Sequence, residues 1–165
     1  MRSDRYFNTE GVCIPQLHYM VRIDDRLKEI KRLFVDRGKY FVINRGRQYG
    51  KTTTLQALAA YLKADYLVLS MDFQAIGTAE YRDEDTFART FAKVLMNALR
   101  SAGSVQKEDE KEQAAGSMPE KEWEKSIDDF VETDKEATLR ELFILISLIC
   151  GRAKKPVVMM IDEVD

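Results

Sequence analysis

A lysine and threonines that follow a glycine could hold a polyphosphate together with a magnesium ion. Lys51 and Thr52 come directly after Gly50, between a short apolar run at residues 40–43 and a segment of helical periodicity. Strand, glycine-containing loop and helix, in that order, are the context of a phosphate-binding loop, where backbone N–H groups and the helix dipole attract phosphates. Lys51 would contact the β- and γ-phosphates, and the Thr52 hydroxyl would ligate magnesium. The residues expected to bind nucleotide here are Arg45, Gly46, Arg47, Gln48, Tyr49, Gly50, Lys51, Thr52 and Thr53.

This loop departs from the usual pattern at one position. The pattern is Gly-x4-Gly-Lys-Ser/Thr, and Arg45 stands where the first glycine is expected, with Gly46 one residue later. Arg45 must therefore hold a conformation that glycine usually takes, or the turn has a different shape. A chance Gly-Lys-Thr at the start of a helix is the alternative, and a second motif argues against it.

Two acids end the last apolar run of the chain. Residues 157–161 are followed by Asp162 and Glu163. A buried parallel strand would deliver Asp162 to its carboxyl end, where the carboxylate could ligate the same magnesium as Thr52. Glu163 could then orient or deprotonate the attacking water, so we expect Glu163 and Lys51 to be catalytic. A strand that merely ends in solvated acids is the alternative, and the phosphate loop weakens it.

The neighbouring residues favour ATP over other nucleotides. A GTPase would show Asp-x-x-Gly here, but the residue three positions after Asp162 is Asp165, and Asn-Lys-x-Asp occurs nowhere in the chain. A small-molecule kinase usually lacks an acid immediately after the magnesium aspartate. The Asp-Glu pair therefore indicates ATP hydrolysis, with ATP and Mg²⁺ as the cofactors.

Short apolar segments alternate with segments of helical periodicity. Strands are predicted at residues 40–43, 66–71 and 157–161. Helices are predicted at residues 23–34, from near Lys51 to residue 62 (apolar positions at 55–62), at 87–98 and at 139–150. Asp24 or Asp25 would cap the first helix, with Gly38 as its left-handed end, and a Thr138–Glu141 capping box would open the last, which Gly151 ends. This alternation indicates an α/β domain with a parallel sheet over residues 23–165, preceded by an extended arm at residues 1–22.

Charge is distributed unevenly along the chain. Residues 101–136 carry twelve acids and five lysines, a net charge of −7, so the rest carries +5 of the formal −2. With glycines, a proline and few apolar residues, 101–136 is predicted to be a solvated insertion in which residues 123–131 could pack a helix onto the body. A mildly basic body suits polyphosphate or nucleic acid and does not distinguish them.

Composition bears on the cellular location. No apolar run approaches the ~20 residues that a membrane helix needs, and the N-terminus has no apolar signal segment, so no membrane partner is expected. Cys13 and Cys150 lie far apart without metal-ligand spacing. They are expected to be reduced thiols in a cytoplasmic protein.

With both motifs in place, the chain resembles the AAA-like ATPases of the STAND and archaeal-type group. Residues 18–22 (HYMVR), 44–54 (NRGRQYGKTTT) and 157–165 (VVMMIDEVD) carry the resemblance. It implies that the segment before the first helix lies against the adenine, although packing in the core is an equal alternative for these three residues, Tyr19, Met20 and Val21. His18 is expected to be structural or superficial rather than catalytic. Asp72, after the second strand, could contact the nucleotide or simply end the strand.

The resemblance also implies a three-layer P-loop NTPase sheet of order 5-1-4-3-2, with residues 40–43, 66–71 and 157–161 as strands 1, 2 and 3. Strands 4 and 5, a polar sensor, an arginine finger and a helical lid would follow Asp165, so the chain is expected to be the N-terminal part of a longer protein. The expected function is Mg-dependent ATP hydrolysis as a conformational switch acting on a C-terminal domain or protein partner. The alternatives are a nucleotide-binding module without turnover and an ATPase that associates with DNA.

Overall fold

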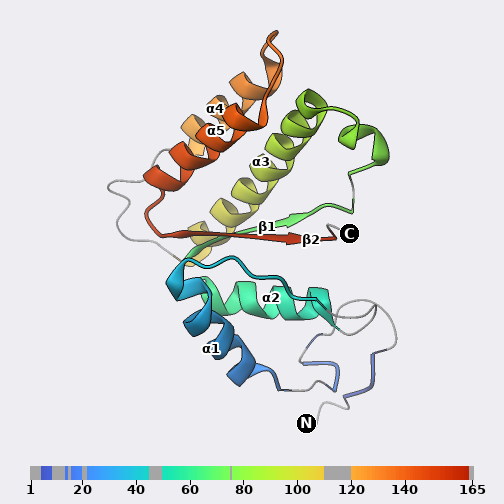
Figure 1. Cartoon of the computed structure of the whole chain (residues 1–165). Coiled ribbons are helices and arrows are strands. Elements are labelled where there is room, and N and C mark those ends of the chain that lie inside the picture. Colours follow the sequence, from blue (N-terminus) through green and yellow to red (C-terminus); the bar gives the residue numbers. More distant parts are fainter. Residues whose placement is uncertain are drawn as a thin grey trace. The chain divides into compact units, whose positions relative to one another are not determined.

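A computed structural model describes residues 5–8, 14, 16–19, 22–44, 50–74, 76–109 and 120–163 of the chain. The chain forms two compact units, Met1–Ala64 and Asp65–Asp165 (Figure 1). Both contain helices, and the second contains a parallel sheet, so the protein belongs to the mixed α/β class. None of the described helices is long and apolar enough to span a membrane.

The sheet of the second unit pairs β1 (Leu67–Asp72) with β2 (Val157–Asp162). The strands are parallel, and their register runs from Leu67 opposite Val157 to Asp72 opposite Asp162. The strands predicted at residues 66–71 and 157–161 are therefore confirmed, each displaced or extended by one residue so that it ends on an aspartate. Within the described residues the sheet has two strands.

Three helices share one core with this sheet: α3 (Glu84–Asp109), α4 (Glu120–Glu132) and α5 (Leu139–Arg152). Figure 1 shows them on the same side of β1 and β2. Alternate residues of β1 face them, because successive side chains of a strand point to opposite sides of the sheet. The most deeply buried large side chains of this core are Leu69, Leu95, Ile127 and Leu142.

The segment at residues 101–136, which was predicted to be a solvated insertion, is mostly helical over its described part. Helix α3 does not end near residue 98 but continues to Asp109, and α4 places Ile127 at 0% exposure in the core. The expectation that a helix near residues 123–131 packs onto the body is confirmed. High charge misled the prediction because the acids and lysines of an amphipathic helix lie on its outer face while a few apolar residues carry the packing.

A polar network ties the loop between α4 and α5 to the start of α3. Arg89 forms an ion pair with Asp85 at 2.9 Å and also donates to the carbonyl oxygens of Val131 and Lys135. The Ala137 N–H donates to Asp85 Oδ1 at 2.6 Å. This bond, helped by Arg89, lowers the pKa of the Asp85 carboxyl. Carbonyl and amide groups at the end of α4 and in the loop after it, which lack helical partners, thus find partners on α3.

The capping box predicted at the start of α5 is confirmed. The Glu141 N–H donates to Thr138 Oγ1 at 3.2 Å, and the Thr138 N–H donates to Glu141 Oε2 at 3.1 Å. The predicted end at Gly151 is wrong by two residues, because Gly151 and Arg152 stay helical and the chain leaves the helix at Ala153 with ψ of 140°.

The first unit contains α1 (Asp24–Leu33) and α2 (Lys51–Leu62), which pack against each other, and a 3-10 turn (Val35–Arg37) after α1. Gly38 has the predicted left-handed conformation, with φ of 59°, but it ends the 3-10 turn. The predicted Asp cap of α1 is wrong: Ile23 holds the cap position without a side-chain bond. Asp24 and Asp25 instead lie in the first turn, where they complement the helix dipole.

The strand predicted at residues 40–43 is absent, since these residues form no ladder with any described segment. Tyr40 is fully exposed and Val42 is 88% exposed, whereas the Phe41 ring packs on Phe34 with centroids 5.2 Å apart. The physical reason is that β-forming residues make a strand only when a neighbouring strand takes up their backbone hydrogen bonds.

Candidate functional site

The phosphate-binding half of the predicted site lies at the start of α2. The helix begins at Lys51, and Gly50 before it has φ of 71° and ψ of 34°. This left-handed conformation favours glycine, although a Cβ would have room, its nearest neighbour being Thr53 Cβ at 3.9 Å. Gly50 holds the N-cap position and has no side chain with which to cap the helix. The first-turn N–H groups of a helix lack intrahelical acceptors and carry the positive end of its dipole, which suits an anion.

Thr54 anchors the glycine and was missed in the sequence. Its side chain is buried, and its Oγ1 donates to the Gly50 carbonyl at 2.8 Å, beside the Thr54 N–H bond to the same oxygen at 2.9 Å. Two bonds to one carbonyl fix the peptide that orients the start of the helix. The signal was present in the sequence as a hydroxyl residue four positions after the glycine, where side-chain bonds to a helical carbonyl occur.

The remaining predicted nucleotide contacts are described only in part. Lys51, Thr52 and Thr53 are half-buried in the first turn of α2, as the prediction required. Tyr19 is exposed, so the alternative of a core position is wrong for this residue. The other predicted contacts, Arg45, Gly46, Arg47, Gln48, Tyr49, Met20 and Val21, lie outside the described residues and stay predictions.

The acidic half of the predicted site lies at the carboxyl ends of β1 and β2. Asp72 and Asp162 are directly opposite each other in the register. Asp72 Oδ1 accepts from the Gln74 N–H at 2.8 Å, and Asp162 Oδ1 accepts from the Glu163 N–H at 3.0 Å. Each carboxylate is thereby oriented by a backbone N–H group that follows it in the chain. The carboxyl ends of parallel strands are where α/β proteins bind ligands.

Glu163 has an unusual backbone conformation. Its φ of 55° is the one positive value among the described non-glycine residues. Such a conformation costs about 1–3 kcal/mol for a residue with a side chain and is concentrated at functional sites. The hydrogen bond from its N–H to Asp162 helps to hold it, and its side chain is exposed.

The predicted magnesium site would need a bound nucleotide to complete it. Thr52 belongs to the first unit and Asp162 to the second, so their common role stays a prediction. In the described part of the chain, no group of three or more His, Cys, Asp or Glu residues could hold a metal by itself. One hydroxyl and one carboxylate fit Mg²⁺ bound largely through phosphate oxygens and water, as is usual for this ion in nucleotide sites.

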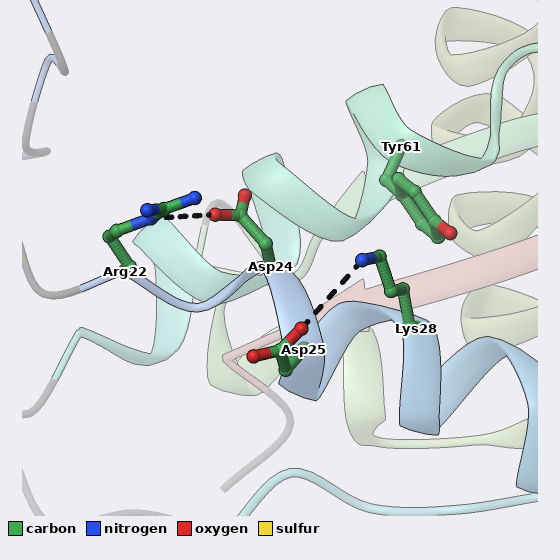
Figure 2. Close-up of a pocket in the computed structure, with 5 residues that line it drawn as sticks. All are labelled: Arg22, Asp24, Asp25, Lys28 and Tyr61. Atoms are coloured by element: carbon green, nitrogen blue, oxygen red, sulfur yellow. Dashed lines mark hydrogen bonds and ion pairs between the residues drawn. The ribbon is translucent and has the colours of Figure 1, made fainter.

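A hollow of about 610 Å³ within the first unit is a separate feature (Figure 2). It is lined by Arg22, Asp24, Asp25, Lys28 and Tyr61. Each cation pairs with an acid, Arg22 with Asp24 at 3.3 Å and Lys28 with Asp25 at 3.7 Å, and these side chains are largely exposed. Tyr61 is roughly 15 Å along the helix from Lys51. The hollow is therefore not the polyphosphate site.

The single histidine and the cysteine of α5 are not reactive groups of this site. His18 is buried, and its Nδ1 accepts the Ile14 N–H at 2.8 Å, which is a structural role. Cys150 is a free cysteine, as expected, and burial raises the pKa of its thiol, which lowers its reactivity. Cys13 lies outside the described residues.

Comparisons of the chain with protein-family models, with curated proteins and with solved structures found no match. The structure defines the class as mixed α/β with a two-stranded parallel sheet. The resemblance to AAA-like ATPases stays a prediction from the motifs.

Proposed function

We propose that this chain binds ATP with magnesium through a P-loop and hydrolyses it as a conformational switch. One observation carries the proposal: Gly50 is left-handed at the start of a helix that opens with Lys51 and Thr52. A chance occurrence of Gly-Lys-Thr would not require Gly50 to adopt a left-handed conformation. The paired strands that end on Asp72 and Asp162 add support, because they bring carboxylates to a ligand-binding edge.

Each group has a separate task in this proposal. The first-turn N–H groups of α2 and the Lys51 ammonium bind the phosphates, and the Thr52 hydroxyl and Asp162 carboxylate ligate magnesium. Glu163 orients the attacking water or accepts its proton. The phosphate loop at residues 45–49 and the segment at residues 19–21 complete the nucleotide contacts.

Calorimetry with Mg-ATP tests the binding step. Lys51→Ala should abolish detectable binding, because it removes the ammonium that pairs with the phosphates. Lys28→Ala is the matched control, since Lys28 is an exposed lysine of the same unit that pairs with Asp25. If both variants bind Mg-ATP as the wild type does, the phosphate site is elsewhere and the proposal fails.

The hydrolysis step needs its own test, because a nucleotide-binding module without turnover is the alternative. Glu163→Gln keeps the size of the side chain and removes the carboxylate. We expect it to bind Mg-ATP like the wild type in calorimetry and to release no phosphate in an ATPase assay. Unchanged phosphate release in Glu163→Gln would contradict the catalytic role of Glu163.

A further inference from the structure

The N-terminal arm has a defined backbone over its described residues. The Tyr6 N–H donates to the Leu17 carbonyl at 3.1 Å, and the Tyr19 N–H donates to the Tyr6 carbonyl at 3.0 Å. The N–H groups of Leu17 and His18 both donate to the Ile14 carbonyl, and His18 Nδ1 accepts the Ile14 N–H in return. The buried His18 ring contacts Tyr6 edge-on with centroids 4.8 Å apart. Two segments of the arm are thus held side by side.

This backbone presents two aromatic rings to solvent. Phe7 is 79% exposed and Tyr19 is 55% exposed, and their ring centroids are 5.0 Å apart with an interplanar angle of 36°. Tyr6, Ile14 and Leu17 of the same arm are exposed as well. Single exposed apolar residues are common, but a contiguous group of them indicates a binding surface. In the second unit, by contrast, the Phe73 ring that contacts Phe91 is buried in the core.

We propose that Phe7 and Tyr19 form the surface on which the base of the bound nucleotide stacks. The inference rests on the proposed function, and it adds Phe7, which no motif in the sequence marks. A flat ring of a base gains about 1–3 kcal/mol by stacking on an aromatic side chain. Because the backbone bonds of the arm already hold the two rings together, little conformational entropy is lost when the base binds.

The position of the arm fits a base rather than a larger partner. The arm and the start of α2 belong to the same compact unit, so one ligand could use both. In the view of Figure 1, the described arm residues lie toward the end of α2 at which the helix begins. Two neighbouring rings offer a surface about the size of one purine, whereas a strand of nucleic acid needs a succession of rings.

The test compares two ligands that differ only in the nucleoside, Mg-ATP and magnesium tripolyphosphate, by calorimetry on the full chain. We expect Phe7→Ala to weaken Mg-ATP binding roughly tenfold and to leave tripolyphosphate binding unchanged. Phe7→Trp should restore or improve ATP affinity. Phe143→Ala, which removes an exposed phenyl ring from α5 in the other unit, is the matched control and should change neither affinity.

Phe7→Trp also gives a direct signal. Its indole fluorescence should change with Mg-ATP and not with tripolyphosphate, and the wild type, whose single tryptophan Trp123 lies on α4, should show no such difference. Unchanged ATP affinity in Phe7→Ala overturns the inference. An equal loss of affinity for both ligands also overturns it, because it would mean that the ring only supports the arm. If Phe7→Ala instead loses binding to single-stranded DNA alone, the rings serve a nucleic acid. If the wild type binds neither ATP nor tripolyphosphate, the proposed function itself fails.

Discussion

Residues 40–43 and 66–71 are both short apolar runs of β-forming residues, yet only the second is a strand. Leu67–Asp72 pairs with Val157–Asp162 along its whole length and buries alternate side chains against α3 and α5. Tyr40 and Val42 stand in solvent beside a backbone that joins no described ladder. The comparison teaches that β-propensity describes how a segment fits a paired, half-buried surface and does not by itself create a strand.

The strongest test of this comparison is to truncate one apolar side chain in each segment. Leu69→Ala should lower the free energy of unfolding by about 2–5 kcal/mol, because it leaves a cavity in the core of the second unit. Val42→Ala should change it by less than about 0.5 kcal/mol, since Val42 already contacts solvent. Urea denaturation measures both. A loss of similar size in Val42→Ala would show that residues 40–43 are packed in solution.

Two glycines of the first unit allow a second comparison, between a site position and a plain turn. Gly50 and Gly38 have similar positive φ angles, 71° and 59°, and space for a Cβ without a close clash. Each substitution by alanine should therefore cost about 1–2 kcal/mol of stability. Only Gly50→Ala should also weaken Mg-ATP binding, because it disturbs the start of α2. If both variants bind Mg-ATP with equal affinity, the left-handed conformation of Gly50 is not needed for nucleotide binding.

The role of Thr54 predicts a smaller effect. Thr54→Val keeps the shape of the buried side chain and removes the bond to the Gly50 carbonyl, which still accepts the Thr54 N–H. We expect a loss of about 0.5–1.5 kcal/mol in the free energy of unfolding. Mg-ATP affinity should fall with it and return in Thr54→Ser, which restores the hydroxyl. Recovery of stability without recovery of affinity would contradict a positioning role for Thr54.

The smallest expected effect concerns how the stability of the second unit falls at acidic pH. The Thr86 N–H donates to Asp83 Oδ1 at 2.8 Å, and this bond, with the Thr86 hydroxyl and Arg82, lowers the pKa of Asp83 to about 2. A lowered pKa in the folded state stabilises the protein above the unfolded value of about 4, and this contribution is lost as the pH falls toward 2. Asp83→Asn keeps an acceptor before α3 and removes the titration. Its urea midpoint should therefore fall less steeply than that of the wild type between pH 5 and 2; an identical slope would contradict this assignment.

Local rules predicted the parts of the fold whose signals lie within a few residues. The Thr138–Glu141 box, the start of α2 at Lys51 and the left-handed Gly38 all follow from short-range hydrogen bonding and sterics. The parallel pairing of β1 and β2 was predicted as well, because continuous apolar runs between helices are typical of parallel strands. The opposition of Asp72 and Asp162 follows from where each run ends.

Long-range partners explain what the sequence did not predict. The packing of Ile127 onto the body was predicted, but its neighbours on α3, Met96 and Leu99, were not, because no local pattern in an acidic segment reports that contact. The Phe7–Tyr19 ring pair depends on a bridge between residues twelve positions apart, Tyr6 and His18. Arg89 is similar, since the carbonyl groups that it binds lie more than forty residues away.

The length of α3 has a consequence for the architecture of the second unit. Its 26 residues extend roughly 39 Å, whereas a strand of six residues extends roughly 20 Å. The sheet can therefore cover only part of α3, and α4 covers more of it: Arg100 pairs with Glu124 at 2.7 Å, and Arg89 donates to the Val131 carbonyl. Deleting α4 would expose apolar side chains of α3, such as Met96 and Leu99, so the acidic segment supplies packing that a helix longer than its sheet requires.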